Sequence, residues 1–148
     1  MDDALIAVFD AKYHYNFWRP VTAIRNGDLD GNAATERDAS WVPFIDTPMH
    51  PEYPCAHCIV AATVAAILKA EIGAEPVPKL STSSPTAAGA VHSWSQIDDL
   101  VQEVANARIY DGVHYRNSTE VGIAMGKKIG ELAAAKYLLM KASAAPSR

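Results

Sequence analysis

The sequence predicts an all-α fold, a helical bundle, on the strength of three observations. Long segments with helical spacing of apolar residues are separated by connections rich in proline, glycine and polar residues. No segment shows a convincing two-residue alternation of the kind typical of a half-buried strand. The chain has 148 residues, of which 49% are hydrophobic and 20% charged, a composition typical of a globular domain with its own core.

The first expected helix spans about residues 3–18. Acidic residues at its start suit the positive end of the helix dipole, and Arg19-Pro20 ends or bends it. A turn-rich segment follows at 26–32, and a second loop at 41–54 contains four prolines. Because proline lacks a backbone N–H group, this second loop is not expected to be regular helix.

The second expected helix spans about residues 56–72, and its alanine-rich body favours helix and close packing. Residues 75–89 are rich in proline, serine and threonine and are expected to form an exposed connector. The third helix starts after Ser93 or Ser95 and ends near Tyr110, with an apolar stripe of helical period between them.

The fourth expected helix spans about residues 118–141, and small residues recur on it every four positions. These residues are Gly122, Gly126, Gly130 and Ala134. They predict a close contact with another helix. Residues 1–148 are expected to form one catalytic-type helical domain. Its last residues, 142–148, are expected to be a flexible tail. Because four helices with long loops make a thin bundle, we expect a larger parent chain or a homo-oligomer.

Charge and hydropathy exclude several kinds of partner. The chain has 13 Lys plus Arg and 17 Asp plus Glu, a net charge of −4, so it lacks the electrostatic footprint of a nucleic-acid-binding protein. It contains no apolar run long enough for a membrane-spanning helix. The acidic start at Met1-Asp2-Asp3 does not resemble a signal peptide. We therefore expect a soluble protein, which is periplasmic or secreted only if an upstream segment has been removed.

Lys12 and Arg19 form the first of three candidate groups. They are two helical turns apart, so they are expected to share one face of the first helix and to bind one anion. Four aromatic residues between 13 and 18 predict a largely buried segment, and buried cations need an anionic partner. The alternative is a pair of solvated surface cations.

The second candidate group is Pro54-Cys55-Ala56-His57, at the start of the second helix. The first N–H groups of a helix lack intrahelical partners and carry the positive end of its dipole, which favours anion binding. Small residues allow an anion to approach this backbone, and a histidine there exchanges protons near neutral pH. The alternative is a structural histidine at an ordinary helix start.

The third candidate group joins Arg108 and His114. Arg108 lies in the last turn of the third helix, and Gly112 permits a sharp reversal before His114. The turn is therefore expected to bring a cation and an imidazole together. This signal is weak alone, but the three groups in this order form a specific pattern.

Together the groups resemble the tripartite signature of the type 2 phosphatidic acid phosphatase and vanadium-dependent haloperoxidase superfamily. That signature is Lys-x6-Arg-Pro, then Pro-Ser-Gly-His, then Ser-Arg-x5-His-x3-Asp. The matching residues are Lys12, Arg19, Pro20, Pro54, His57, Arg108 and His114. The sequence departs from the signature at Cys55, Ala56, Ala107 and Ser118. Because Ser118 replaces the usual aspartate, the carboxylate that orients the imidazole is missing, and Asp111 could replace it only if the turn brings it near.

The resemblance implies an α-helical bundle with its site between helices. It implies that vanadate or phosphate is bound by Lys12, Arg19, Cys55, Ala56, Arg108 and His114. It also implies that His57 is the general acid–base and that His114 is the nitrogen ligand of vanadium or, in a phosphatase, the nucleophile. With vanadate as cofactor, the implied reaction is oxidation of a halide by hydrogen peroxide.

Phe17-Trp18-Arg19-Pro20 and the segment 112–116 are nearer to the haloperoxidase branch. His50 lies seven residues before His57, a position similar to the halide-selectivity residue, which is His in bromide-type enzymes and Phe in chloride-type ones. The resemblance therefore favours bromide over chloride. Two alternatives use the same pocket: a vanadate-inhibited, metal-independent acid phosphatase acting on phosphate esters, and a non-catalytic oxyanion-binding domain.

Two other motifs suggest different chemistry. Cys55-Ala-His-Cys58 could be a redox dithiol, or could bind zinc with a nearby histidine, although its residues are crowded on one helical turn. The loop 26–37 resembles the first half of a calcium loop, but Arg37 stands where a bidentate glutamate belongs. We expect this loop to be an ordinary surface loop.

Overall fold

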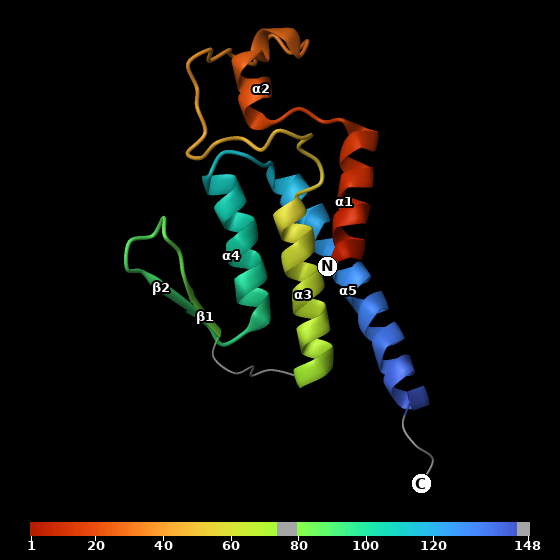
Figure 1. Ribbon diagram of the computed structural model, residues 1–148. Helices are drawn as coiled ribbons and strands as arrows, with labels where there is room; N and C mark the ends of the chain where they lie inside the picture. Colours follow the sequence, from red (N-terminus) through yellow and green to blue (C-terminus); the bar gives the residue numbers. More distant parts are fainter. Residues whose placement is uncertain (74–79, 145–148) are drawn as a thin grey trace.

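The computed structural model describes residues 1–73 and 80–144, with side chains described as far as residue 137. The described part is mostly helical, and the predicted helical bundle is confirmed (Figure 1). The long helices are α1 (Asp2–Tyr15), α3 (Ala56–Ile72), α4 (Ile97–Tyr110) and α5 (Arg116–Ala144). A short helix, α2 (Pro20–Arg25), lies beyond one end of the bundle, next to a long loop.

A short antiparallel hairpin was not expected from the sequence. Strands β1 (Leu80–Ser83) and β2 (Val91–Trp94) pair with Leu80 opposite Trp94, and they lie beside α4 (Figure 1). Only these two opposed residues are partly buried. Both faces of the hairpin are otherwise exposed, so its sequence lacks the apolar alternation that identifies a strand. The expected connector at 75–89 is therefore wrong where β1 lies, and residues 75–79 are outside the described residues.

Helix α1 is shorter than predicted. Asn16 adopts the left-handed conformation (φ 47°), and its N–H group donates to the carbonyl oxygen of Lys12. Arg19 consequently lies outside α1, as the N-cap of α2, so the prediction that Lys12 and Arg19 share one helix face was wrong. At the other end of the chain, α5 takes in residues 142–144 of the predicted tail, and residues 145–148 are outside the described residues.

The closest helix packing joins α3 and α5 through the glycines that recur every four residues. A Cβ atom at Gly126 would overlap the carbonyl oxygen of Ile59, and one at Gly130 would lie 2.6 Å from the carbonyl oxygen of Thr63. The hydroxyl of Thr63 donates to the carbonyl oxygen of Gly126 at 3.0 Å. The small residues thus allow the two backbones to approach closely and fix how the helices are aligned.

This alignment gathers the ends of four helices. Helices α1 and α4 end, and α3 and α5 begin, at the same end of the bundle, next to α2 and the loop that follows it (Figure 1). The three candidate groups lie at these helix ends or in the adjoining loops. Within the described residues, no helix is both long enough and apolar enough to cross a membrane.

We predict that Gly126→Ala destabilises the protein. The added methyl group meets backbone rather than a flexible side chain, so overpacking should outweigh the higher helix propensity of alanine. The expected loss is about 2 kcal/mol in the free energy of unfolding, measured by urea denaturation. Lys128→Ala, at an exposed position of α5, is the control and should change stability little. An unchanged Gly126→Ala variant would show that α3 and α5 are not packed this closely.

Candidate functional site

His114 is the centre of the candidate site. It lies in the turn between α4 and α5 and is 4% exposed. Its Nδ1 atom is 2.6 Å from Oε1 of Glu52, and its Nε2 atom is 3.1 Å from Nη1 of Arg19. Because a guanidinium group only donates, Nε2 accepts from Arg19, and the single ring proton lies on Nδ1 and is donated to Glu52. This assignment leaves the lone pair of Nε2 directed toward the cations.

The environment of the ring also favours its neutral form. Burial lowers the pKa of His114 to about 4; the hydrogen bond to Glu52 opposes this shift, whereas Arg19 and Lys12 add to it. The 2.6 Å contact with Glu52 would also suit an ion pair with a charged imidazole. A charged ring, however, would direct a second N–H group at the guanidinium of Arg19, which donates to the same atom. We therefore take the neutral tautomer as the resting state.

Arg19 connects His114 with the loop before α3. Nη1 donates to the carbonyl oxygen of Val113 at 2.8 Å, and Nε donates to the carbonyl oxygen of His50 at 3.0 Å. Nη2 lies 3.1 Å from Nδ1 of His50. Burial lowers the pKa of Arg19, with Glu52 opposing the shift and Arg108 adding to it. The guanidinium is thus held in place by contacts that are independent of any bound anion.

Lys12 is fully buried at the end of α1. Its ammonium group donates to the carbonyl oxygens of Pro51 (2.9 Å) and Glu52 (2.8 Å). Burial and the charge of Arg19 lower the pKa of Lys12 to about 7, although Glu52 opposes the shift. A bound anion would favour the charged form, because an opposite charge nearby raises the pKa of a lysine.

Arg108, in the last turn of α4, contributes a third buried cation. Its Nη1 atom is 2.9 Å from Oδ2 of Asp111. Its Nε atom is buried and has no hydrogen-bond partner within the described residues, so a donor is left for a further acceptor. Burial lowers the pKa of Arg108, and Asp111 opposes the shift. Asp111 thus pairs with Arg108, whereas the carboxylate on His114 comes from Glu52.

His57 is exposed in the first turn of α3. Partial desolvation lowers its pKa, and the charges of Arg108, His50 and Arg19 lower it further, while Asp111 opposes the shift. The charges that act on His57 thus include those of two of the three cations, Arg108 and Arg19. A neutral, accessible histidine at this position can accept a proton.

Cys55 and Ala56 differ in what they can offer an anion. Cys55 forms a disulfide with Cys58, and its N–H group donates to the carbonyl oxygen of Ser118 at 3.2 Å. Both cysteines are buried and pack with Ala105, so the side chain of Cys55 lies in the core and has no thiol proton to donate. Ala56, the first residue of α3, retains the small side chain that allows an anion near the helix start.

The alternative metal sites find no support in the part of the chain that the structure describes. There, no three His, Cys, Asp or Glu side chains are grouped so that they could hold a metal ion. The disulfide occupies both sulfur atoms that a zinc site would need. In the loop with partial likeness to a calcium site, Asp28 instead lies 3.7 Å from Arg37. By contrast, three buried cations and an unpaired N–H group suit an oxyanion.

The aromatic residues near the cations are not buried as predicted. Tyr13, Tyr15, Phe17 and Trp18 are between 48% and 65% exposed. The cations are instead buried by the loop before α3, whose carbonyl oxygens they contact. Some of these rings form a pocket of about 590 Å³ on the Glu52 side of His114. Its lining residues are Tyr15, Phe17, Glu52, Tyr53, Tyr115, Asn117 and Ser118.

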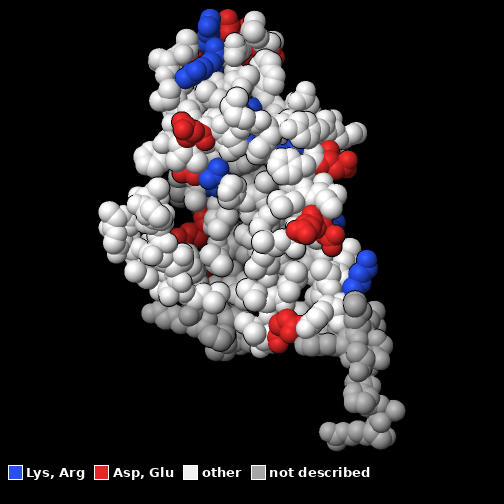
Figure 2. Space-filling model, in the orientation of Figure 1, with Lys and Arg blue, Asp and Glu red and all other residues white. Residues whose placement is uncertain are grey.

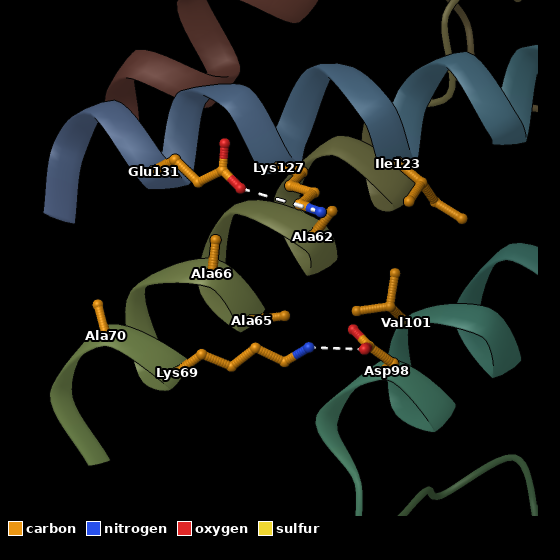
Figure 3. A pocket seen from close by; sticks show the side chains of 10 residues that line it. All are labelled: Ala62, Ala65, Ala66, Lys69, Ala70, Asp98, Val101, Ile123, Lys127 and Glu131. Carbon is orange, nitrogen blue, oxygen red and sulfur yellow. Dashed lines mark ion pairs between the residues drawn. The ribbon is translucent and has the colours of Figure 1, made fainter. Parts of the chain in front are cut away.

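Another pocket, of about 350 Å³, lies among α3, α4 and α5 (Figure 3). It is lined mainly by small and apolar side chains and by the ion pairs Lys69–Asp98 (2.6 Å) and Lys127–Glu131 (3.9 Å). It contains none of the predicted site residues. On the surface, acidic and basic residues are scattered over the face shown in Figure 2 and form no continuous basic patch there.

Sequence reasoning missed Glu52. It lies in the proline-rich loop at 41–54, where nothing in the spacing distinguishes it from Glu36 or Asp46. One signal was available: the absence of the usual carboxylate four residues after His114 requires a replacement from elsewhere in the chain. The sequence could not say which acidic residue supplies it, because Glu52 is 62 residues away from His114.

We predict that His114 remains neutral, with its proton on Nδ1, until the solution is strongly acidic. Titration of ¹⁵N-labelled histidine by NMR should give a midpoint of about 4, because desolvation and two cations outweigh the carboxylate. An unperturbed histidine would titrate near ~6.5. The His114→Asn variant assigns the signal by removing it. A midpoint at or above the ordinary value would mean that Glu52 holds a charged imidazole instead.

Comparison with known proteins identifies the family and the fold. The family model described as the VCPO second helical-bundle domain matches residues 1–141. A search of curated protein sequences finds no match. Among solved structures, one described as the first bacterial vanadium-dependent iodoperoxidase shares 30% identity, with a TM-score of 0.76 over 90% of this chain and 30% of that one.

Two further structures show the same fold. The apo and holo forms of a bacterial vanadium-dependent chloroperoxidase are 21% and 22% identical to this chain, with TM-scores of 0.73 and 0.72. Each match covers 90% of this chain and 33% of the other. The chain therefore spans about a third of the length of these proteins. By its family model and its structural neighbours, the chain belongs to the vanadium haloperoxidase branch of the superfamily that its motifs resemble, as a VCPO second helical-bundle domain.

Proposed function

We propose that this chain binds vanadate and carries the catalytic residues of a haloperoxidase that oxidises halide with hydrogen peroxide. The observation that supports this most directly is the arrangement at His114. Its Nε2 lone pair faces Arg19, and the charge of buried Lys12 also acts on the ring. The charge of Arg108 acts on Arg19, and its buried Nε–H group has no partner within the described residues. The site combines a nitrogen donor with cations for the oxygen atoms, which is the set of groups that an oxyanion cofactor with a metal centre requires.

In this proposal each of the three cations contributes to oxyanion binding in a different way. Arg108 offers its unpaired Nε–H, and Lys12 offers a charge that the oxyanion itself stabilises. Arg19 would offer its guanidinium to an oxygen of the ligand in place of Nε2 of His114, since its bonds to the carbonyl oxygens of Val113 and His50 do not involve the ring. His114 would hold the metal centre through Nε2, and vanadate, when bound, would supply the Lewis acidity that activates hydrogen peroxide.

His57 is the proton carrier in this scheme. Its lowered pKa leaves the ring neutral near pH 7, so that it can accept a proton from hydrogen peroxide. The overall reaction joins a halide ion, hydrogen peroxide and one proton to give a hypohalous acid and water. The halide loses two electrons and the peroxide gains them.

His50 is the proposed halide-selectivity residue and favours bromide over chloride. Its ring contacts Arg19 through Nδ1 (3.1 Å) and packs edge-on against Phe9, with ring centroids 5.3 Å apart. The ring thus lies beside a cation of the oxyanion site, where it can contact a small anion. Bromide is also easier to oxidise than chloride, which makes it the less demanding substrate.

We predict that the protein brominates a phenol indicator only when vanadate, hydrogen peroxide and bromide are all present. His57→Ala should reduce this rate by about 10²- to 10⁴-fold, because it removes the proton carrier. The matched control is His92→Ala, in the hairpin, which should leave the rate unchanged. Hydrolysis of phosphate esters that vanadate inhibits, without bromination, would instead support the acid phosphatase. Vanadate binding without turnover would support a non-catalytic domain.

We predict further that Cys55→Ser binds vanadate more tightly than Cys58→Ser. Both variants lose the disulfide, but only the first places a hydroxyl donor at the N-cap of α3. One additional hydrogen bond should strengthen binding by about 3- to 10-fold, measured by calorimetry. Equal affinities would show that the side chain at position 55 does not reach the oxyanion.

A further inference from the structure

Glu52 is a carboxylate in an environment that disfavours one. It is fully buried in the loop before α3. Its Oε1 atom accepts a hydrogen bond from Nδ1 of His114 (2.6 Å) and another from the N–H group of Tyr115 (3.0 Å). A buried carboxylate destabilises a protein unless it is paired and hydrogen-bonded, so these two contacts largely decide whether the side chain can remain there.

The backbone of Glu52 is fixed from the opposite side of the site. Its N–H group donates to the carbonyl oxygen of Phe17 at 3.0 Å, and its own carbonyl oxygen accepts from Nζ of Lys12 at 2.8 Å. One residue therefore links the end of α1, the segment leading to α2 and the turn before α5. The carboxylate is held by its main chain and does not depend on His114 alone for its position.

The second carboxylate oxygen indicates a role beyond stability. Oε2 of Glu52 is buried and has no hydrogen-bond partner within the described residues. An unsatisfied buried oxygen destabilises the folded state, and a neutral or apolar side chain would avoid that penalty. The negative charge of Glu52 opposes the positive charges of Lys12 and Arg19. The closest contact of its carboxylate is with the imidazole of His114, through Oε1.

Two other side chains could have oriented this imidazole. Ser118, at the position of the aspartate in the signature, has its hydroxyl 3.4 Å from Nδ1, considerably farther than Glu52. Asp111 is bound to Arg108. We propose that Glu52 is the positioning residue of His114, supplying from a loop 62 residues upstream the carboxylate that the signature places four residues downstream.

This inference rests on the proposed function for its catalytic consequence. The hydrogen bond to Glu52 and the donation from Arg19 together keep the ring proton on Nδ1 and the Nε2 lone pair toward Arg19. The negative charge would also stabilise positive charge that develops on the ring when Nε2 binds an electrophilic centre. A carboxylate that served only to offset the charges of Lys12 and Arg19 would not need to lie on Nδ1.

The test compares Glu52→Gln with Ser118→Ala and with the double variant Glu52→Gln, Ser118→Asp. Glu52→Gln keeps an acceptor oxygen for Nδ1–H but removes its charge, so the hydrogen bond should weaken. It should move the Nδ1 proton signal of His114 upfield in NMR and weaken vanadate binding by about 10- to 100-fold. Ser118→Ala should change neither property. The double variant restores a carboxylate beside Nδ1 from the position of the signature, so it should recover the proton signal and most of the affinity.

Two readouts keep this proposal separate from haloperoxidase activity. The Nδ1 proton signal is measured without any ligand, so it tests Glu52 even if the protein proves to bind no vanadate. Circular dichroism establishes that each variant is folded. Glu52→Asp, which keeps the charge on a shorter side chain, replaces Glu52→Gln if the latter does not fold and should give a partial loss. A folded Glu52 variant with the Nδ1 proton signal of the parent, or an affinity within twofold of it while His114→Ala abolishes binding, overturns the proposal.

Discussion

The burial of three cations at one end of the bundle constrains the rest of this structure. Lys12, Arg19 and Arg108 come from three separate segments, and like charges at close range destabilise one another. The loop before α3 compensates by turning carbonyl oxygens toward the first two, while Asp111 pairs with the third. This loop is therefore part of the site's electrostatics. Burial is the first cause of the lowered pKa of each cation, and an anion bound nearby would favour the charged forms.

The packing of α3 against α5 determines how the residues of the site are placed relative to one another. The glycines of α5 allow its backbone to lie against α3, so the first turns of both helices come together. At that point the N–H group of Cys55 donates to the carbonyl oxygen of Ser118, which joins the second candidate group to the segment after His114. A change that separated these helices would displace His57 from His114 without altering either residue. The arrangement of the candidate groups thus depends on the small-residue spacing of α5.

The sequence predicted the helices better than it predicted their connections, and it brought five residues forward as candidates for the site. Lys12, Arg19, His57, Arg108 and His114 each lie in a short local motif, and local spacing is visible in a sequence. Helix α1 ends at Asn16 because that residue turns left-handed, which apolar periodicity does not reveal, and the hairpin is too exposed to show alternation. Glu52 was missed because its role depends on a contact across 62 residues, set by the course of a proline-rich loop. Sequence spacing identifies residues of this kind only indirectly, through the partner that is missing elsewhere.

Two departures from the signature, at Ser118 and at Cys55, have different consequences in the structure. Ser118 removes a carboxylate next to His114, and Glu52 provides one on the same ring nitrogen from another segment. A carboxylate therefore still contacts the imidazole of His114, but it comes from the loop before α3 and not from the segment after His114. Cys55 differs, because the disulfide commits its side chain to the core and nothing described replaces the lost donor at that point. Arg19 contacts Nε2 of His114 and, separately, the carbonyl oxygen of Val113, so its position does not depend on the ring alone. If the proposed oxyanion binds here, the cations and the imidazole are already in place for it, and the start of α3 lacks one hydrogen-bond donor that the signature supplies.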